Sequence, residues 1–499
     1  MKAVVMAGGE GSRLRPLTSG IPKPLVPVVG KPVMEHILRL LRQHGVSDVI
    51  VTLQYLGSAI RDYFGDGSDF GVDITYVVED APLGTAGSVK NAQEYLDEPF
   101  IVISGDALTD IDLTRVMAYH REKGAAATIV LTSVANPLEY GVVITNQDGT
   151  INRFLEKPSW GEVFSDQVNT GIYVIEPTVL DLLPPATVVD WSGDVFPKML
   201  TNAMPLYGYL ASGYWCDIGN IQTYYQANWD ALEGRVDVEI AGERRHGNVW
   251  MGENVEVGLG VRIEGSAYIG NDCKLKAGVF INGPVCIGNF SVVDENTKVS
   301  NSVIWTYSYL GENSRLRQAI VCRHCTIKNN CLLEEGAVIG DDVVVGEGTT
   351  IDAGVKIWPD KEIEPGSTVH ESIIWAAASC RFRWCSSIHG NTTSPDRCTC
   401  RCRRSTAARP ISGCSTATAS SSTSERSGSW KTSSSARTSG ASTSTRWATS
   451  AIRRTRSTPT SMAWSARSMS KPFGRRIRRC WSTSTMAAGR WCCRGSSRS

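Results

Sequence analysis

Short, continuous apolar runs recur through the first 235 residues, and helical patterns separate them. The runs lie at 2–7, 48–56, 73–79, 100–106 and 126–134. Runs of this length without polar alternation are typical of strands that are buried on both faces of a sheet. After the first run, one face of a predicted helix carries Val33, Ile37, Leu38 and Leu41, and Gly45 follows at a C-cap position. The pattern predicts a doubly wound, Rossmann-like α/β domain whose ligand binds beyond the carboxyl ends of the strands.

A strict repeat follows this domain, because an aliphatic residue returns at every sixth position. The first series is Met251, Val257, Ile263, Ile269, Leu275, Ile281, Ile287, Val293 and Val299. The second series is Ile327, Leu333, Ile339, Val345, Ile351, Ile357, Ile363 and Val369. A period of six with glycine often following the aliphatic residue is the signature of a hexapeptide, left-handed parallel β-helix. The change of register between Val299 and Ile327 predicts a loop or an irregular coil.

These patterns divide the chain into four parts. We expect the α/β domain at 1–235, a linker at 236–248, the β-helix at 249–375 and a tail at 376–499. The tail differs sharply in charge, since it holds 23 basic and 2 acidic residues, whereas residues 1–375 hold 28 and 48. It also lacks Leu and Val, so it cannot bury enough apolar area to order itself, and we expect disorder.

The tail composition also limits what the tail can do. It is rich in Ser, Thr and Arg and contains 9 of the 15 cysteines, but no pair of C-x-x-C motifs at zinc-finger spacing. Regularly spaced aromatic residues for stacking on nucleic acid are also missing, so we expect no nucleic-acid partner. The abrupt change of composition resembles a GC-rich gene translated in the wrong frame. We therefore interpret the tail as a frameshift product without a selected function.

The loop that follows the first predicted strand, residues 6–25, suits an anion. Its backbone is made accessible by Gly8, Gly9 and Gly11, and its positive charge comes from Arg13 and Lys23. Three prolines stiffen the segment. It lacks the G-K-[ST] ending of a Walker A motif and the last glycine of a dinucleotide fingerprint, so neither common phosphate-binding motif fits.

Taken whole, this loop resembles the signature of the sugar-phosphate nucleotidyltransferases, G-G-x-G-x-R-L-x-P-L-T-x-x-x-P-K-P. Further family-like blocks follow in order: PLGTAGS (82–88), SGDALTD (104–110), EYGVV (139–143), FLEKP (154–158), NTGIYV (169–174), WSGDVFP (191–197) and GYWCDIG (213–219). The resemblance covers residues 1–375. Within the family it is closest to the mannose-1-phosphate guanylyltransferases, particularly the bacterial type fused to a phosphomannomutase-like domain. It implies the formation of GDP-mannose and pyrophosphate from GTP and mannose 1-phosphate.

Such a reaction brings two polyanions together, so their repulsion must be offset before an in-line attack on the α-phosphorus. Mg²⁺ is the expected cofactor, because it binds one or two carboxylates together with phosphates and water. Asp106 ends an apolar run and Asp217 follows an aromatic pair, so both could lie at the mouth of the sheet. The resemblance makes these two aspartates the metal ligands.

The resemblance also implies the remaining roles. Arg13 and Lys23 would be catalytic, stabilising charge on the phosphates and on the departing pyrophosphate. The nucleotide would be held by Ala7, Gly8, Gly9, Gly11, Pro82, Leu83, Gly84 and Thr85. Lys157 would hold the sugar phosphate, and the sugar would be contacted by Gly141, Glu156 and Asn169. The chain departs from the family at Asn220 and Ile221, which replace a small residue and a proline, so the local loop shape is in doubt.

Other functions stay open at this stage. Within the class of nucleotidyltransferases, the alternative is a glucose-1-phosphate uridylyl- or thymidylyltransferase. Outside this class, the alternative is a non-catalytic regulatory subunit. The retained charged residues disfavour such a subunit. Many hexapeptide proteins are acyltransferases with a catalytic histidine, but His246, His324 and His370 lie in no recognisable motif. CRHC (322–325) with Cys331 lies inside the repeat, where cysteine acts as a small apolar filler rather than a zinc ligand.

The sequence also supports expectations about assembly and location. We expect the β-helix to be structural, mediating homo-oligomer formation or regulation. No charged leader precedes a long apolar stretch, and no run of about 18 apolar residues occurs. We therefore expect a cytoplasmic protein without a membrane partner.

Overall fold

The computed structural model describes residues 1–159, 161 and 165–374. The tail predicted at 376–499, with its disorder, its cysteines and its interpretation as a frameshift product, lies outside the described residues. In the described part of the chain, every helix is too short or too polar to cross a membrane.

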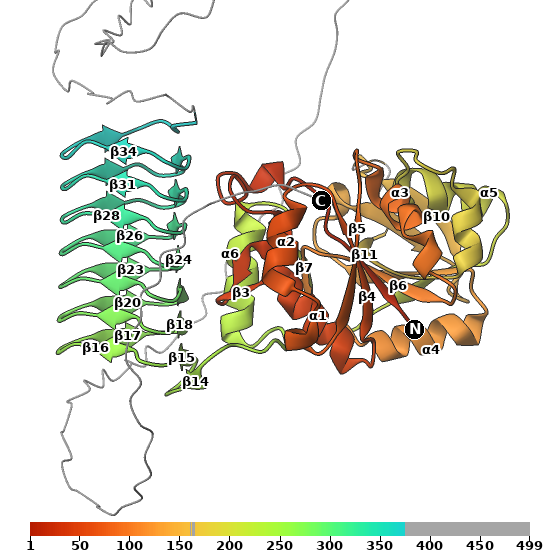
Figure 1. The fold of residues 1–499 in the computed structure, drawn as a ribbon, viewed down its shortest axis with the longest axis horizontal. Helices are drawn as coiled ribbons and strands as arrows, with labels where there is room; N and C mark the ends of the chain where they lie inside the picture. The colour runs from red at the N-terminus through yellow and green to blue at the C-terminus, as the bar shows by residue number, and fades with distance from the viewer. Residues whose placement is uncertain (160, 162–164, 375–499) are drawn as a thin grey trace, which may run out of the picture. The chain divides into compact units, whose positions relative to one another are not determined.

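Four parallel strands form the centre of the first domain, in the order β6-β1-β4-β5 (Figure 1). Their bounds are β1 (Ala3–Met6), β4 (Asp48–Leu53), β5 (Asp73–Val78) and β6 (Phe100–Ser104). All four coincide with predicted apolar runs. Along β1, Ala3 and Val5 join one buried cluster and Val4 joins another, so both faces of the sheet are covered. The predicted doubly wound α/β class is confirmed.

The sheet has nine strands and is mixed, because β11 (Gln167–Ile175) runs antiparallel to both β6 and β8 (Ala127–Ser133). β12 (Leu206–Leu210) pairs in parallel with β8, and β9 (Gly141–Thr145) pairs with β10 (Ile151–Glu156). A separate ribbon joins β7 (Ala107–Thr109) to β13 (Trp215–Asp217) in antiparallel fashion. The register of this ribbon sets Asp217 opposite Ala107, the residue after Asp106.

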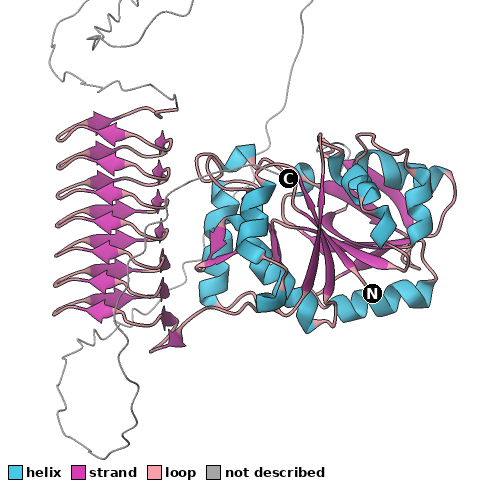
Figure 2. Cartoon of the chain, in the orientation of Figure 1, coloured by secondary structure: helices cyan, strands magenta, loops and turns pink. Residues whose placement is uncertain are grey.

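Helices lie on both sides of this sheet (Figure 2). Their bounds are α1 (Val33–Gln43), α2 (Gly57–Phe64), α3 (Gly84–Asn91), α4 (Leu113–Lys123), α5 (Phe196–Thr201) and α6 (Ile221–Glu233). The predicted apolar face of α1 is fully buried, and Gly45 beyond its end has a φ of +76°. At the start of α6, Asn220 accepts a hydrogen bond from the Thr223 backbone amide (2.9 Å) and closes a capping box. The departure from the family pattern at Asn220 thus provides a helix cap.

Short parallel strands after residue 243 stack into the three sheets of a β-helix. The first sheet contains β14 (Glu243–Arg244), which is antiparallel to its neighbour, and then β15 (Val249–Met251), β18 (Ala267–Ile269), β21 (Val285–Ile287), β24 (Val303–Ile304), β27 (Ile320–Val321), β30 (Val338–Ile339) and β33 (Lys356–Ile357). The second contains β16 (Glu256–Val257), β19 (Lys274–Leu275), β22 (Val292–Val293), β25 (Tyr309–Leu310), β28 (Thr326–Ile327), β31 (Val344–Val345) and β34 (Glu362–Ile363). The third contains β17 (Arg262–Glu264), β20 (Phe280–Asn282), β23 (Lys298–Ser300), β26 (Arg315–Arg317), β29 (Leu332–Leu333), β32 (Thr350–Ile351) and β35 (Thr368–Val369).

The predicted irregular coil between Val299 and Ile327 is wrong. Strand pairing continues through this region without a break. Several pairs here join residues 17 positions apart, as in Cys286 with Val303, Val303 with Ile320 and Arg315 with Leu332, whereas the turns before and after pair at 18. Two five-residue steps, from Val299 to Ile304 and from Leu316 to Val321, account for the change of register. Ile304, Leu316 and the other aliphatic residues in these turns stay buried in the core of the β-helix.

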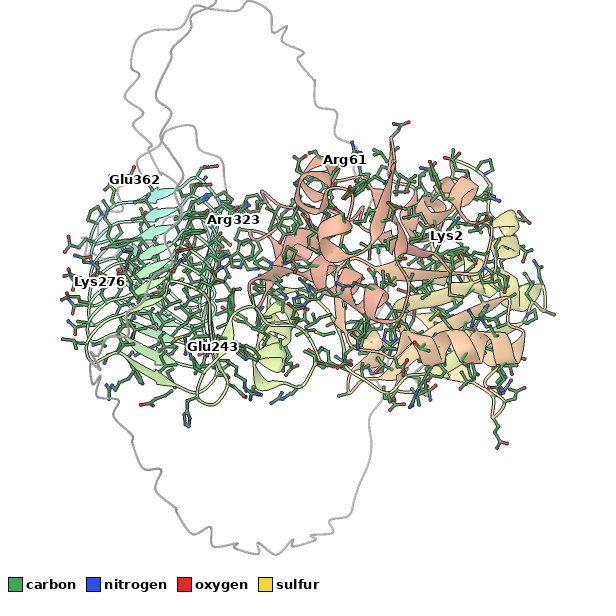
Figure 3. All side chains as sticks on the ribbon, turned by 60° about the horizontal axis from the view of Figure 1, so that its bottom comes forward. Lys2, Arg61, Glu243, Lys276, Arg323 and Glu362 are labelled. Carbon is green, nitrogen blue, oxygen red and sulfur yellow. The ribbon has the colours of Figure 1, made fainter. Side chains whose placement is uncertain are left out.

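Charged side chains cover the outside of the β-helix, where some form ion pairs between neighbouring turns. Lys276, labelled in Figure 3, lies 3.0 Å from a carboxylate oxygen of Asp294. Lys274 lies 2.8 Å from Glu256, and both of these side chains are exposed. The separation of aliphatic interior from charged exterior means that the β-helix is stabilised mainly by stacked apolar side chains.

Replacing Leu316 by alanine tests this interior. Leu316 is 1% exposed, so we expect the truncation to leave a cavity and to lower the free energy of unfolding by about 2–5 kcal/mol. The matched control is Leu259→Ala, because Leu259 is 80% exposed in the same coil, and its loss should change stability by less than about 0.5 kcal/mol. Urea unfolding followed by circular dichroism measures both. Equal effects of the two substitutions would contradict the assignment of Leu316 to the core.

Candidate active site

The loop after β1 folds back on itself so that Lys23 comes close to Gly11. Gly11 has a φ of +61°, and its carbonyl oxygen accepts hydrogen bonds from Thr18 Oγ1 (2.8 Å) and from the Leu14 amide (3.0 Å). A Cβ atom at position 11 would lie only 3.0 Å from Lys23 Cβ. Glycine is therefore required here for conformation and for space, and its presence lets Lys23 approach the start of the loop.

Lys23 Nζ lies between the carboxylates of Asp106 and Asp217. It forms a short ion pair with Asp106 and lies 3.3 Å from Asp217 Oδ1. Ser104 Oγ donates a hydrogen bond to the other oxygen of Asp106. The three charged side chains are 10%, 24% and 29% exposed, so the interaction is only partly screened by water. The structure thus brings together three residues that are far apart in the sequence.

The electrostatics of this cluster reflect its partial burial. Burial by itself lowers the pKa of Lys23, but the two carboxylates outweigh it and hold that pKa above the usual value. Burial would raise the pKa of Asp106, yet Lys23 and the Ser104 hydrogen bond bring it below the usual range. For Asp217, burial and the nearby negative charge of Asp106 raise the pKa despite Lys23. The raised pKa of Asp217 therefore reflects its burial first and the neighbouring carboxylate second.

Arg13 lies beside the same cluster. A Cβ atom on Gly219 would be 3.4 Å from Arg13 Nη2 and 3.0 Å from Asp217 Oδ2, which puts the guanidinium group next to that carboxylate. Tyr140 also lies here, because its ring packs edge-on against Trp215 at 5.4 Å, and burial together with the charge of Asp217 raises its pKa. Two cations and two carboxylates therefore converge at the ends of β6 and β13.

The two predicted nucleotide segments meet at Glu79, which the sequence analysis did not identify. Glu79 follows β5 and accepts a hydrogen bond from the Leu83 amide (3.1 Å). A Cβ atom on Gly8 would lie 3.7 Å from its other carboxylate oxygen. Gly8 itself accepts from the Tyr55 amide (3.4 Å), and the Ala7 amide donates to Thr52 (3.0 Å). The loops at 7–11 and 82–85 therefore lie side by side.

The 82–85 loop is fixed from the other side by the segment before α5. Gly84 has a φ of +74°, and a side chain there would clash with the Val189 backbone. Thr85 Oγ1 donates to Asp190 Oδ2 (2.6 Å), and Asp190 also caps the helical turn at 191–195 through the Ser192 and Gly193 amides. This contact links the predicted nucleotide loop to the predicted sugar-binding residues.

Those predicted sugar-binding residues gather on β9, β10 and β11. Gly141 pairs with Glu156, and a Cβ atom at position 141 would lie 2.8 Å from Glu156 Oε2. Burial raises the pKa of Glu156, with Asp190 adding to the effect. Asn169 Nδ2 donates to Ser192 Oγ (3.1 Å) and to Tyr173 Oη (2.9 Å).

Lys157 stands at the end of β10 in a left-handed conformation, with a φ of +46°. Its amide donates to the Tyr140 carbonyl oxygen (3.1 Å), and Tyr140 faces the aspartate cluster. The backbone of Lys157 is therefore joined to that of Tyr140, which lies beside the aspartate cluster.

The sequence patterns did not identify four of the residues that make these contacts: Glu79, Ser104, Tyr140 and Asp190. Each lies within or next to a family-like block or an apolar run, so its neighbourhood was visible in the sequence. Asp190 also carried a local signal, because aspartate is one of the residues preferred at a helix N-cap. What the sequence lacked was any indication that Asp190 reaches Thr85, 105 positions earlier.

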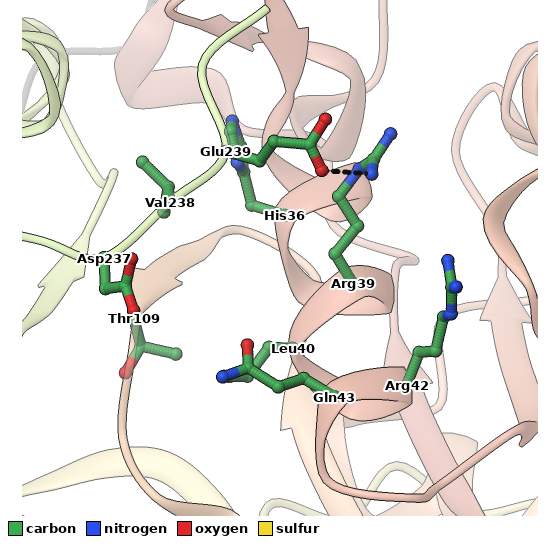
Figure 4. Close-up of a pocket in the computed structure, with 9 residues that line it drawn as sticks. All are labelled: His36, Arg39, Leu40, Arg42, Gln43, Thr109, Asp237, Val238 and Glu239. Atoms are coloured by element: carbon green, nitrogen blue, oxygen red, sulfur yellow. Dashed lines mark hydrogen bonds and ion pairs between the residues drawn. The ribbon is translucent and has the colours of Figure 1, made fainter.

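A separate cavity of about 540 Å³ lies between α1 and residues 237–239 (Figure 4). His36, Arg39 and Glu239 line it, and Arg39 Nη1 forms an ion pair of 2.6 Å with Glu239. Burial lowers the pKa of His36 to about 4, so this histidine is neutral near pH 7. None of the predicted site residues lines this cavity.

The histidines and cysteines of the β-helix take part in its own packing. His324 and His370 lie 3.4 Å and 2.5 Å from aspartate oxygens of the neighbouring turn. Cys325 and Cys331 donate to backbone carbonyl oxygens at 3.0 Å and 3.1 Å, and burial raises the pKa of Cys325 to about 12. Among the described residues, no three His, Cys, Asp or Glu side chains gather as a metal site.

Fold and site together define a nucleotide-binding α/β transferase with a β-helix attached. Residues 2–234 match the family described as Nucleotidyl transferase, and residues 246–351 match the EIF2B subunit epsilon LbH domain. The chain is 40% identical over 345 residues to a UTP–glucose-1-phosphate uridylyltransferase of Synechocystis, covering 66% of this chain and 89% of that protein. The chain therefore belongs to the sugar-phosphate nucleotidyltransferase family.

Mannose-1-phosphate guanylyltransferases are further relatives. The Mycobacterium tuberculosis protein is 36% identical over 234 residues, which cover 46% of this chain and 65% of that protein. The Candida albicans protein is 37% identical over 230 residues, which cover 44% of this chain and 61% of that protein. These two matches span less than two thirds of the relatives' own length.

Replacing Lys23 by methionine tests the charge balance of the cluster. The raised pKa of Asp217 should rise further, so the folded state should favour its protonated form. Stability is then retained below the unfolded-state pKa of about 4 and lost as the pH rises through the folded-state pKa. We expect the variant to lose about 3 kcal/mol of unfolding free energy at pH 8 and clearly less at pH 5.

Lys274→Met is the matched control, because it removes an exposed ion pair and should cost less than about 1 kcal/mol at either pH. Urea unfolding at the two pH values measures both variants. A loss for Lys23→Met that is independent of pH would show that the carboxylates are not coupled to Lys23.

Proposed function

We propose that this protein transfers a nucleoside monophosphate from GTP to mannose 1-phosphate, forming GDP-mannose and pyrophosphate. The observation that carries the proposal is the convergence of Lys23 and Arg13 on Asp106 and Asp217, beside the glycine-rich loop. A site for two polyanionic substrates needs cations at its centre and accessible backbone amides at its edge. Mannose-1-phosphate guanylyltransferases among the relatives support the choice of base and sugar.

The proposed reaction is a single in-line displacement. A phosphate oxygen of the sugar phosphate attacks the α-phosphorus of the triphosphate, and the bond from the α-phosphorus to the bridging oxygen breaks, releasing pyrophosphate. Arg13 and Lys23 stabilise the charge that develops on the phosphates and on the leaving group. No covalent enzyme intermediate is needed, so the task of the protein is to hold and neutralise the two substrates.

Asp106 and Asp217 would hold Mg²⁺ in this proposal. The donor set fits, because both carboxylates contact the same cation, Lys23 Nζ, and Mg²⁺ binds one or two carboxylates together with phosphate and water oxygens. Burial and the negative charge of Asp106 raise the pKa of Asp217, and a bound cation would favour its ionised form. When bound, the ion neutralises part of the triphosphate charge.

The other predicted residues take their expected roles in the proposal. The triphosphate and base lie along the adjoining segments 7–11 and 82–85, which Glu79 connects. Lys157 holds the sugar phosphate, and Gly141, Glu156 and Asn169 contact the sugar. The two carboxyl groups Glu156 and Asp190 suit a sugar, because its hydroxyl groups can donate hydrogen bonds to them.

A glucose-1-phosphate uridylyltransferase is the second candidate. The relative from Synechocystis favours it, because that match extends over 345 residues and 89% of that protein. A thymidylyltransferase is the remaining alternative within the class. A non-catalytic regulatory subunit is disfavoured, because the charged residues that the chemistry needs are retained and converge. Homo-oligomer formation and a cytoplasmic location stay predictions from the sequence.

Pyrophosphate release should be measured over a grid of GTP, UTP, dTTP, ATP and CTP against mannose and glucose 1-phosphates, with Mg²⁺. We expect the highest turnover with GTP and mannose 1-phosphate. Turnover confined to UTP or dTTP with glucose 1-phosphate would replace the guanylyl assignment by the second candidate. No turnover with any pair would support the regulatory subunit instead.

Asp106→Asn and Asp217→Asn test the metal assignment. Each should lower kcat by about 100-fold or more, because an electrostatic stabiliser of the transition state is lost. Each should also raise the Mg²⁺ concentration needed for half-maximal rate. The control is Asp272→Asn at a β-helix corner, where the preceding turn carries Asn254 and an amide is tolerated, so kcat should not change. Full activity of the Asp106 variant would remove this aspartate from the proposed site.

A further inference from the structure

The segment that carries Lys23 contacts the β-helix on both sides of that lysine. Before it, a Cβ atom on Gly20 would lie 3.3 Å from Asp341 Oδ2 and 3.6 Å from Arg323 Nη2, which form an ion pair with each other. After it, Gly30 has a φ of +82°, and a side chain there would clash with the Tyr268 ring. Lys23 therefore lies in a stretch of eleven residues, 20–30, whose two ends touch the β-helix.

A chain of buried hydrogen bonds joins the β-helix to the backbone just beyond Lys23. Trp305, directly after β24, donates from Nε1 to Tyr224 Oη (2.8 Å). Tyr224, on α6, donates from Oη to the carbonyl oxygen of Pro27 (2.8 Å). Tyr224 is fully buried and Trp305 is 2% exposed. Burial raises the pKa of Tyr224 well above its usual value, so the hydroxyl keeps its proton and remains a donor.

Asn228 adds a second connection one helical turn along α6. Its Oδ1 accepts a hydrogen bond from the Val29 amide (3.0 Å), and its Nδ2 donates to the Tyr224 carbonyl oxygen (2.9 Å). Cys286 of the β-helix donates from Sγ to the same Oδ1 (3.5 Å). The backbone at 27–29 is therefore held by two side chains of α6, and each of these is contacted by a residue of the β-helix.

This support lies close to Lys23 along the chain. Lys23–Leu25 forms one helical turn, which closes with a hydrogen bond from the Val26 amide to the Lys23 carbonyl oxygen (3.0 Å). Val26 and Val28 are fully buried in the same apolar cluster as Trp305. Only three residues separate Lys23 from Pro27. A displacement of the backbone at Pro27 should therefore also displace Lys23.

We propose that Trp305 and Tyr224 are positioning residues for Lys23: the β-helix, acting through α6, holds Lys23 Nζ at Asp106 and Asp217. Neither Trp305 nor Tyr224 touches these carboxylates, so both act through the backbone at Pro27. The effect on catalysis rests on the proposed function, whereas the placement of Lys23 does not. The β-helix is thus part of the support of the active site.

The first test measures the placement of Lys23 without any substrate. The full chain is treated with formaldehyde and a borohydride reductant, and mass spectrometry follows methylation of Lys23 relative to Lys90, whose ammonium group bonds the Leu180 carbonyl oxygen. In Tyr224→Phe and Trp305→Phe, we expect Lys23 to react about tenfold faster, because one supporting hydrogen bond is lost. Unchanged reactivity of Lys23 in both variants would overturn the proposal.

Tyr225→Phe is the matched control for this test. Tyr225 is the next residue on α6, and its hydroxyl donates to the Gln318 carbonyl oxygen of the β-helix (2.5 Å) instead of to the Lys23 segment. The control variant therefore loses a hydrogen bond between the same two elements, and Lys23 should react at the rate of the unmodified chain. An equal acceleration in the control would show general loosening, which would also overturn the proposal.

The second test is kinetic and uses the substrate pair with the highest turnover. We expect Tyr224→Phe to lower kcat about tenfold with the KM for the sugar 1-phosphate unchanged, because the predicted sugar residues lie on β9, β10 and β11. Tyr225→Phe should leave both constants unchanged. An effect confined to KM would contradict positioning of Lys23. If no substrate pair reacts at all, the proposed function fails, and the methylation test still decides the placement of Lys23.

Discussion

The structure depends on keeping two carboxylates close together in a place that water only partly reaches. Asp106 and Asp217 come from β-ribbon partners, and their mutual repulsion is offset by Lys23 from a third segment. Like charges this close favour protonation of one group, and burial together with the charge of Asp106 raises the pKa of Asp217. In the proposed function, Mg²⁺ would add a further positive charge at this cluster. The surrounding contacts can be understood as means of holding these three side chains in place.

The sequence predicted the elements that depend on local pattern. Continuous apolar runs identified β1, β4, β5, β6 and β8, and the period of six identified the β-helix, because both patterns report which side chains face a core. Asp106 ends such a run, which predicted its place at the mouth of the sheet, whereas its role as a metal ligand was implied by the family resemblance. The antiparallel insertion of β11 between β6 and β8 was not found, since a buried apolar run carries no information about strand direction. That strand carries Asn169, which donates a hydrogen bond to Ser192.

Pairings between distant segments account for most of what the sequence did not reveal. Asp217 could be proposed as a ligand, but its position opposite Ala107 depends on a ribbon between residues more than 100 positions apart. Glu79 and Asp190 look like ordinary turn residues until the loops that they connect are seen side by side. The prediction of an irregular coil between Val299 and Ile327 was wrong for a related reason. A change of register shows how many residues are missing but not where they are missing, and two shortened corners preserve the stack just as well.

The need for an external support of Lys23 follows from the kind of segment that carries it. Residues 7–32 contain only short turns and a two-residue ribbon, so few of their own backbone hydrogen bonds fix the lysine. Proline and apolar side chains restrict the backbone conformation of this segment, but they do not determine the direction of the Lys23 ammonium group. A β-helix is suited to the missing role, because each turn is paired with the next and the whole stack resists local distortion. Contacts with the β-helix can therefore hold in place a loop that has few regular hydrogen bonds of its own.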